Sequence, residues 1–143
     1  AEVKVRAEDI FARKAAAARL DAAKLLLAEK RRVIDGIYAA ALRRLQALGE
    51  EECLALTSRL LKEYAEEGDE IVFAVGYPYA AAAAKLPVVA EKKLTISPVG
   101  ADIDGGFLLR GRISDKDLSY GTLLAADRDA HQAEIAAELF KDR

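Results

Sequence analysis

Apolar and charged residues are interspersed, without a strong helix breaker, over the first third of the chain. Between Lys4 and Leu48 there is no proline and a single glycine, Gly36. Most other residues in this stretch are Ala, Leu, Lys, Arg or Glu, which lose the least conformational freedom on entering a helix. The pattern predicts one continuous helix of about 43 residues, or roughly 65 Å.

The apolar face of this helix changes along its length. From Ile34 to Leu48 it is broad, as expected for a helix packed on its own domain. From Lys4 to Arg19 it is narrow and mostly alanine, which favours close contact with a second helix. Residues 49–143 are too few to cover so long a face, so we expect the N-terminal half to pair with another chain. The alternative is a helix folded back on its own domain.

Two imperfect repeats run through the helix. Phe11, Ala18 and Leu25 are spaced by seven, whereas Ala15, Leu26 and Ile37 are spaced by eleven. An eleven-residue repeat favours straight or right-handed winding over the left-handed heptad supercoil. The predicted interface with the partner helix comprises Ile10, Phe11, Ala18, Leu25 and Leu26.

The remaining pattern predicts short elements. Gly49 ends the long helix, and Glu50–Glu52 place negative charge in the first turn of a second helix that ends near Gly68. The expected strands are Glu70–Val75, Leu94–Ser97, Phe107–Ile113 and Leu118–Tyr120, with a polar turn at Ser114–Asp117. The other expected helices are Tyr79–Leu86, closed by Pro87, and a last helix from about Gly121 to Phe140.

These elements predict an α+β fold in two parts. Residues 1–48 form the long N-terminal helix, a coiled-coil stalk part that we expect to be truncated at its start because the chain has no methionine. Residues 49–143 form a globular domain with a four-stranded, mainly antiparallel sheet flanked by helices.

Composition narrows the classes of partner. The formal net charge is -2 with both signs interspersed, so there is no broad basic footprint for nucleic acid. The apolar runs are too short for direct insertion into a membrane. The single cysteine, Cys53, excludes an internal disulfide and fits a reduced, cytoplasmic setting.

No arrangement of residues in the sequence indicates a catalytic, cofactor-binding or metal-binding site, and we expect a chain that is not an enzyme. Phosphate-binding and nucleotide-binding glycine motifs are missing. Cys53 is expected to be a small buried apolar residue, and His131 a partly buried structural histidine on the apolar side of the last helix. A small enzyme using Asp102, Asp104 or His131 is the weakest alternative.

Two further groups have a structural and a functional interpretation. Asp102 and Asp104 precede Gly105-Gly106, but the further oxygen ligands of a calcium loop are missing, so a turn with solvated acids is favoured. Arg110 and Arg112 lie two apart on an expected strand. They are expected to be solvated, although an exposed basic face could also meet an acidic partner.

The C-terminal third resembles the E subunit of the V-type (vacuolar, archaeal and bacterial) ATPases. Residues 102–111, Asp-Ile-Asp-Gly-Gly-Phe-Leu-Leu-Arg-Gly, are similar to the Ile-Asp-Gly-Gly-Phe-Ile-Leu-Arg-Gly segment of that family. An aromatic, two leucines, an arginine, Glu-Ile-Ala and Leu-Phe follow at the family's spacing, although Gly121 stands where the family usually has an acid. The residues that carry the resemblance are Asp104, Gly105, Gly106, Phe107, Arg110, Gly111, Leu124, Arg128, Ile135 and Phe140.

The resemblance implies a non-catalytic stator role without a cofactor. In the family, the E subunit pairs through its long N-terminal helix with the smaller, helical G subunit, and its C-terminal domain contacts the nucleotide-binding head. This peripheral stalk holds the head against rotor torque in a proton- or sodium-translocating ATPase or ATP synthase. The expected location is cytoplasmic, with peripheral association to the membrane through the complex. The alternative is a generic coiled-coil homodimer with a globular interaction domain.

Overall fold

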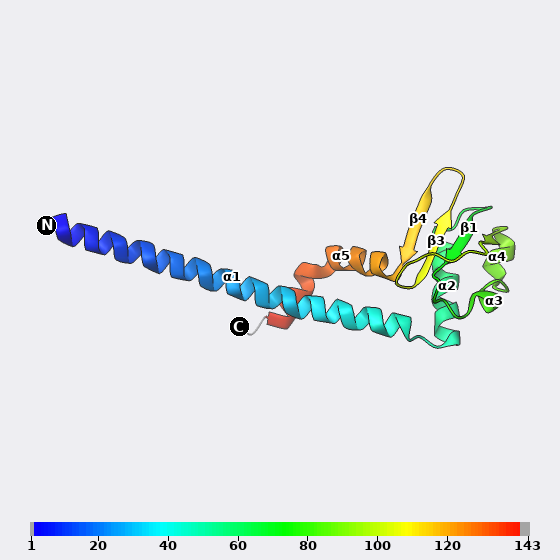
Figure 1. Cartoon of the computed structure of the whole chain (residues 1–143), viewed down its shortest axis with the longest axis horizontal. Coiled ribbons are helices and arrows are strands. Elements are labelled where there is room, and N and C mark those ends of the chain that lie inside the picture. Colours follow the sequence, from blue (N-terminus) through cyan, green and yellow to red (C-terminus); the bar gives the residue numbers. More distant parts are fainter. Residues whose placement is uncertain (1, 141–143) are drawn as a thin grey trace. The chain divides into compact units, whose positions relative to one another are not determined.

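The computed structural model describes residues 2–140, and the side chains of residues 4–139. It confirms the predicted α+β class, with a long N-terminal helix followed by a small domain built on a four-stranded sheet (Figure 1). In chain order the elements are α1 (Glu2–Gln46), α2 (Glu50–Tyr64), β1 (Glu70–Phe73), α3 (Ala80–Ala83), α4 (Pro87–Glu91), β2 (Thr95–Ile96), β3 (Gly106–Arg110), β4 (Asp115–Ser119) and α5 (Tyr120–Phe140).

The chain divides into two compact units. The first contains α1 as far as Ile37 together with α5 from Ala133 onward, and the second runs from Tyr38 to Gln132. The predicted division between Leu48 and Gly49 separates the long helix from the rest of the chain and stays a prediction.

The long helix is continuous, as its composition predicts. α1 runs from Glu2 to Gln46, and Gly36 does not interrupt it. The next glycine, Gly49, has an extended backbone (φ -70°, ψ 170°) and is the N-cap of α2, whose first turn holds the three acidic residues Glu50–Glu52. The negative charge there complements the helix dipole.

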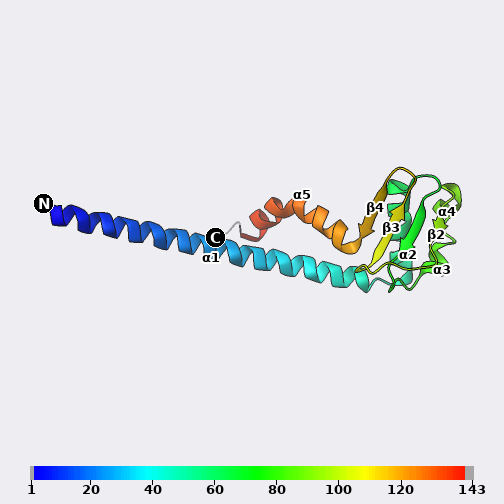
Figure 2. The same ribbon diagram turned by 45° about the horizontal axis from the view of Figure 1, so that its top comes forward.

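The sheet of the second unit is mixed, because β1 pairs in parallel with β2 and antiparallel with β3. The strand order is β2-β1-β3-β4, and β3 pairs antiparallel with β4 (Figure 2). The register aligns Phe73 with Phe107 and Phe107 with Leu118. These side chains belong to one core cluster with Leu61 of α2 and Val88 of α4, so the helices and one face of the sheet share a single apolar core.

Several predicted boundaries were wrong. The predicted strand Phe107–Ile113 ends at Arg110, and the predicted turn Ser114–Asp117 is mostly strand, because β4 begins at Asp115. The polar residues Asp115–Asp117 belong to the edge strand of the sheet, where charged side chains are common. The predicted helix Tyr79–Leu86 is helical only over Ala80–Ala83, and Pro87 begins α4 instead of closing a helix.

Lys92, just after α4, closes the C-terminal end of α2. Its Nζ donates hydrogen bonds to the carbonyl oxygens of Leu61 (2.9 Å), Lys62 (2.8 Å) and Ala65 (2.7 Å). The last carbonyls of a helix have no partner within the helix, and a cation at this end also complements the helix dipole. One ammonium group therefore ties α2 to the segment that leads into β2.

We expect Lys92→Met, which keeps the apolar stem, to lower the free energy of unfolding by about 1–3 kcal/mol, because three carbonyls lose a charged donor. The matched control is Lys93→Met. Lys93 contacts Glu67 at 3.4 Å with both side chains more than 70% exposed, and such a pair contributes about 0–1 kcal/mol. Urea unfolding of the two variants checks this expectation, and equal losses would contradict it.

Candidate functional site

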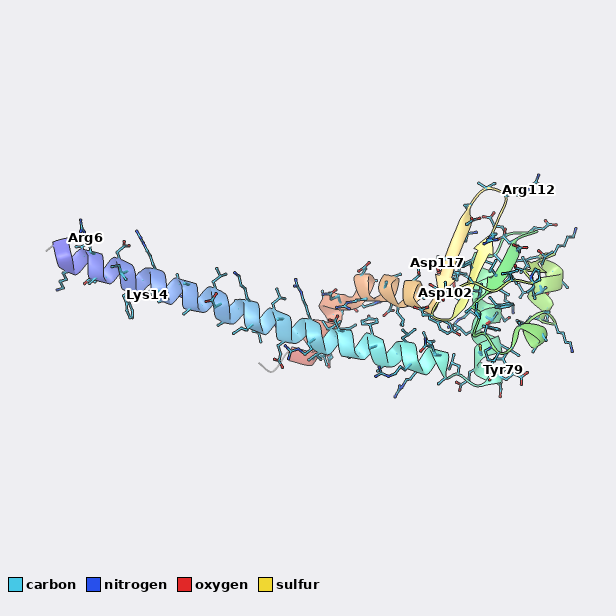
Figure 3. The ribbon with its side chains drawn as sticks, viewed as in Figure 1. Arg6, Lys14, Tyr79, Asp102, Arg112 and Asp117 are labelled. Carbon is cyan, nitrogen blue, oxygen red and sulfur yellow. The ribbon has the colours of Figure 1, made fainter. Side chains whose placement is uncertain are left out.

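The N-terminal part of α1 is a row of exposed side chains. From Lys4 to Glu29 every residue is exposed except Ala15, which is half-buried. Large apolar side chains are among them, with Phe11 75% and Leu25 73% exposed. Figure 3 shows side chains projecting along this helix, with Arg6 and Lys14 labelled. An extended set of exposed apolar side chains is typical of an interaction surface.

The five residues of the predicted partner interface do not share one face of α1. At about 100° per residue, Phe11, Ala18 and Leu25 lie within a narrow stripe, and Leu26 lies at its edge. Ile10 projects about 100° away from Phe11 and about 160° away from Leu26. We call Phe11, Ala15, Ala18, Ala22, Leu25, Leu26 and Val33 the first stripe. The prediction that this stripe contacts a partner stays a prediction.

A second stripe was missed in the sequence. It consists of Val5, Ala12, Ala16, Leu20, Ala23, Leu27 and Ile34, and lies about 120° around the helix from the first. Its signal is an unbroken eleven-residue repeat, since Val5, Ala16 and Leu27 are spaced by eleven, as are Ala12, Ala23 and Ile34. The alanines conceal this repeat when only large apolar residues are compared.

The family-like motif lies at a junction within the second unit. Asp104 is exposed, as expected, and its Oδ1 also accepts a hydrogen bond from the backbone N–H of Gly121 (3.0 Å), at the start of α5. A Cβ on Gly121 would collide with this carboxylate. Glycine at position 121, where the family usually has an acid, therefore leaves room for Asp104 to cap α5.

Gly105 and Gly106 let the start of β3 approach α5 closely. Both have positive φ, +145° and +77°, and a Cβ on Gly105 would overlap the ring of Tyr120. A Cβ on Gly106 would lie 2.6 Å from the carbonyl oxygen of Leu118. Residues with a side chain rarely adopt these backbone angles. The two glycines thus allow Tyr120 to pack against the backbone of β3.

The next motif residues belong to β3 and its turn. Phe107 is 1% exposed in the core. Arg110 is exposed and lies 3.9 Å from Glu70 on β1, which places it in a cross-strand charge pair. Arg112 lies beyond the strand end, at the tip of the hairpin (Figure 3). A Cβ on Gly111 would lie 2.6 Å from the carbonyl oxygen of Ser114, so this position in the hairpin turn has no room for a side chain.

The remaining motif residues lie on α5. Leu124 and Arg128 line a groove with Tyr38 and Leu42 of α1. The Arg128 guanidinium lies 5.8 Å from the centroid of the Tyr38 ring, while the Tyr38 hydroxyl donates to Asp127 (2.8 Å). These contacts attach the start of α5 to the last turns of α1 within the second unit.

Two residues at the C-terminal side complete the motif. Ile135 is half-buried. Phe140 is the last residue of α5, and its side chain lies outside the described part of the chain.

Ser119 also caps the N-terminus of α5, because its Oγ accepts a hydrogen bond from the backbone N–H of Thr122 (3.4 Å), and Asp117 supports this arrangement. The backbone N–H of Ser119 donates to Asp117 Oδ1 (2.9 Å), and the Thr122 hydroxyl donates to Asp117 Oδ2 (2.8 Å). The hydrogen bond from the Ser119 backbone holds the pKa of Asp117 below its usual value. Carboxylates at this end of a helix are favoured by its dipole.

A small cavity next to the motif contains the cysteine. It has a volume of about 90 Å³ and is lined by Cys53, Tyr77, Gly105 and Tyr120, among others. Pockets for organic ligands are several times larger, roughly 300–1,000 Å³. Burial raises the pKa values of the Tyr77 and Tyr120 hydroxyls, which moves both further from titration near neutral pH. The cavity is better explained as a packing space than as a reaction site.

The expectations for single polar residues had mixed outcomes. Cys53 is buried, as predicted. The prediction for His131 was wrong, because its side chain is 50% exposed and its Nδ1 contacts the carbonyl oxygen of Asp127 (3.0 Å) one turn earlier in the helix. Asp102 is exposed. In the described residues 2–140, no group of three or more His, Cys, Asp or Glu side chains is arranged to hold a metal ion.

Comparison with known proteins leaves the family open. The sequence matches no family model, and no curated protein matches it. None of the helices within residues 2–140 combines the length and the apolar character needed to cross a lipid bilayer.

We expect Gly105→Ala to lower the free energy of unfolding by about 2–3 kcal/mol, because Ala strains the backbone and displaces the Tyr120 ring. Gly76→Ala is the control, since a Cβ there meets nothing within 4 Å. Thermal and urea unfolding of both variants measure the difference. A Gly105→Ala protein as stable as Gly76→Ala would refute the proposed packing.

The lowered pKa of Asp117 predicts a pH dependence. Its carboxylate contributes stability above the unfolded pKa of about 3.9, and this contribution is lost as the pH falls through the lower folded value. Asp117→Asn should therefore be less stable than the wild type at pH 7, and the gap should shrink at pH 3. Urea unfolding at both pH values checks this, with Asp102→Asn as the control. A gap independent of pH would disprove it.

Proposed function

We propose that this chain is a non-catalytic peripheral-stalk protein of a rotary V-type ATPase or ATP synthase, equivalent to the E subunit of that family. The observation that carries the proposal is α1, a continuous helix of 45 residues whose apolar side chains are exposed from Val5 to Leu27. The exposure of these apolar side chains is explained if a second helix covers them in the assembled protein. In the proposed role that second helix belongs to the helical G subunit of the stalk.

The family-like motif supports the same proposal. Asp104, Gly105 and Gly106 join the end of α1 to the starts of β3 and α5, and Phe107 belongs to the core. Each of these contacts maintains the domain. A motif of this kind is expected in a protein whose domain must dock firmly and transmit force.

The mechanism of such a stalk protein is mechanical. The paired helices form a stalk that resists bending, and the C-terminal domain binds the nucleotide-binding head. Held in this way, the head does not turn with the rotor, so torque is converted into ATP synthesis or into proton or sodium transport. The chain would be cytoplasmic and associated with the membrane only through the complex.

Charge distribution favours a different partner over a second copy of the chain. Between Phe11 and Val33 there are seven basic residues, Arg13, Lys14, Arg19, Lys24, Lys30, Arg31 and Arg32, and two acidic ones, Asp21 and Glu29. In a parallel homodimer these basic segments would lie side by side and repel one another. The generic homodimer is therefore the less favoured alternative.

Co-expression with the helical stalk partner of the same complex tests the proposal. We expect a one-to-one heterodimer by size-exclusion chromatography with light scattering, and a higher helical content by circular dichroism than the sum of the separate chains. The pair, but not the chain alone, should bind the isolated nucleotide-binding head. As a control, Arg112→Ala in the hairpin turn should leave pairing unchanged. A homodimer that ignores the helical stalk partner would rule the proposal out.

A further inference from the structure

Both stripes of α1 contain eleven-residue apolar repeats, and the second stripe leads into a buried face of the helix. From Val5 to Ile34 its eleven-residue repeat contains only apolar residues, and at the same spacing it extends to Tyr38 and Leu45. Each stripe includes one acidic residue, since Glu29 falls on the centre line of the first and Asp9 lies near the N-terminal end of the second. Eleven residues make almost three full helical turns, so the second stripe runs nearly straight along the helix.

One end of the second stripe is already covered. Ile34 is 2% exposed, and Tyr38 and Leu45 are half-buried. Toward the N-terminus the same stripe is open, with Leu27 49%, Leu20 57% and Val5 64% exposed. The open part is therefore the direct continuation of a face that α1 already uses for packing.

One side of the second stripe is flanked by basic side chains only. Arg13, Lys24 and Arg31 lie about 60–80° to one side of it, and Arg19 lies about 60° to the other. All four side chains are exposed, and Arg13 also pairs with Asp9 at 2.9 Å. Of the acids in this part of the helix, Asp21 and Glu29 lie about 140° from the stripe, Glu8 lies about 80° away on the side of Arg19, and Asp9 lies on the stripe near its N-terminal end.

Resting on the proposed function, we infer that the partner helix lies along the second stripe, between Ala12 and Arg31, and that it carries acidic residues on the side of its apolar seam that faces Arg13, Lys24 and Arg31. Alanines at positions 12, 16 and 23 allow the two backbones to approach closely. Arg13, Lys24 and Arg31 then face the acidic side chains, as charges flanking a helical seam do in coiled coils. Such charges select the partner and its orientation more than they add affinity.

Two synthetic helices of about 33 residues, each with three eleven-residue apolar repeats, are suitable probes. One has Glu at the positions that flank its seam, and its twin has Lys there. We expect the full-length chain to bind the Glu peptide at least tenfold more tightly than the Lys peptide in low salt, as measured by fluorescence anisotropy. Added salt should reduce the difference.

Matched double variants locate the face. Leu20→Glu/Leu27→Glu should abolish binding of the Glu peptide, whereas Leu25→Glu/Leu26→Glu, with the same change of charge on the first stripe, should change it less than threefold. A triple variant, Arg13→Glu/Lys24→Glu/Arg31→Glu, should reverse the preference toward the Lys peptide. Circular dichroism of each variant verifies that the helix is retained.

Several results would overturn the inference. They are binding to neither peptide, equal binding to both, or loss of binding only in the Leu25→Glu/Leu26→Glu variant. If the peptides bind as expected but the helical stalk partner does not co-purify with the chain, the proposed function fails and the assignment of the stripe stands. If that partner co-purifies and is released only by the first-stripe variant, the proposed function stands and the inference fails.

Discussion

The ring of Tyr120 lies against the backbone of Gly105 and Gly106, and the second unit depends on this close approach. Any side chain at these positions would move the start of α5 away from β3. Around the same point, Gln46 Nε2 donates to the carbonyl oxygen of Asp104 (2.8 Å), and Asp104 caps α5. One site therefore holds together the end of α1, the start of β3 and the start of α5. Its residues, Gln46, Asp104 and Tyr120, lie far apart in the sequence.

Local patterns were sufficient for the long helix and the fold class, because composition and periodicity act over a few residues. They were not sufficient for contacts that join distant segments. The hydrogen bond between Asp104 and Gly121 spans 17 positions, and no local rule identifies it. Polar residues gave two wrong predictions. Asp115–Asp117 lie in a strand instead of a turn, and His131 is exposed instead of partly buried. The second stripe was readable from spacing alone, but only when alanines were included.

The proposed role and the structure agree in what each part of the molecule needs. The small domain buries its own apolar residues, which cluster between the sheet and helices α2 to α4. The N-terminal part of α1 leaves its apolar side chains exposed. Contact with another helix would bury them and lower the free energy. The basic residues beside the second stripe favour a partner helix that carries acidic side chains. In the proposed pair, apolar contact would supply the affinity and charge would select the partner.

A protein can also associate by adding a strand of another molecule to an edge of its sheet. Both edges of this sheet disfavour such an addition. The edge strand β4 carries Asp115, Lys116 and Asp117 in succession, and the other edge strand, β2, has two residues. Charged or very short edges are poor templates for an added strand. Strand addition at either edge of the sheet is therefore disfavoured, which directs association to the exposed apolar side chains of α1.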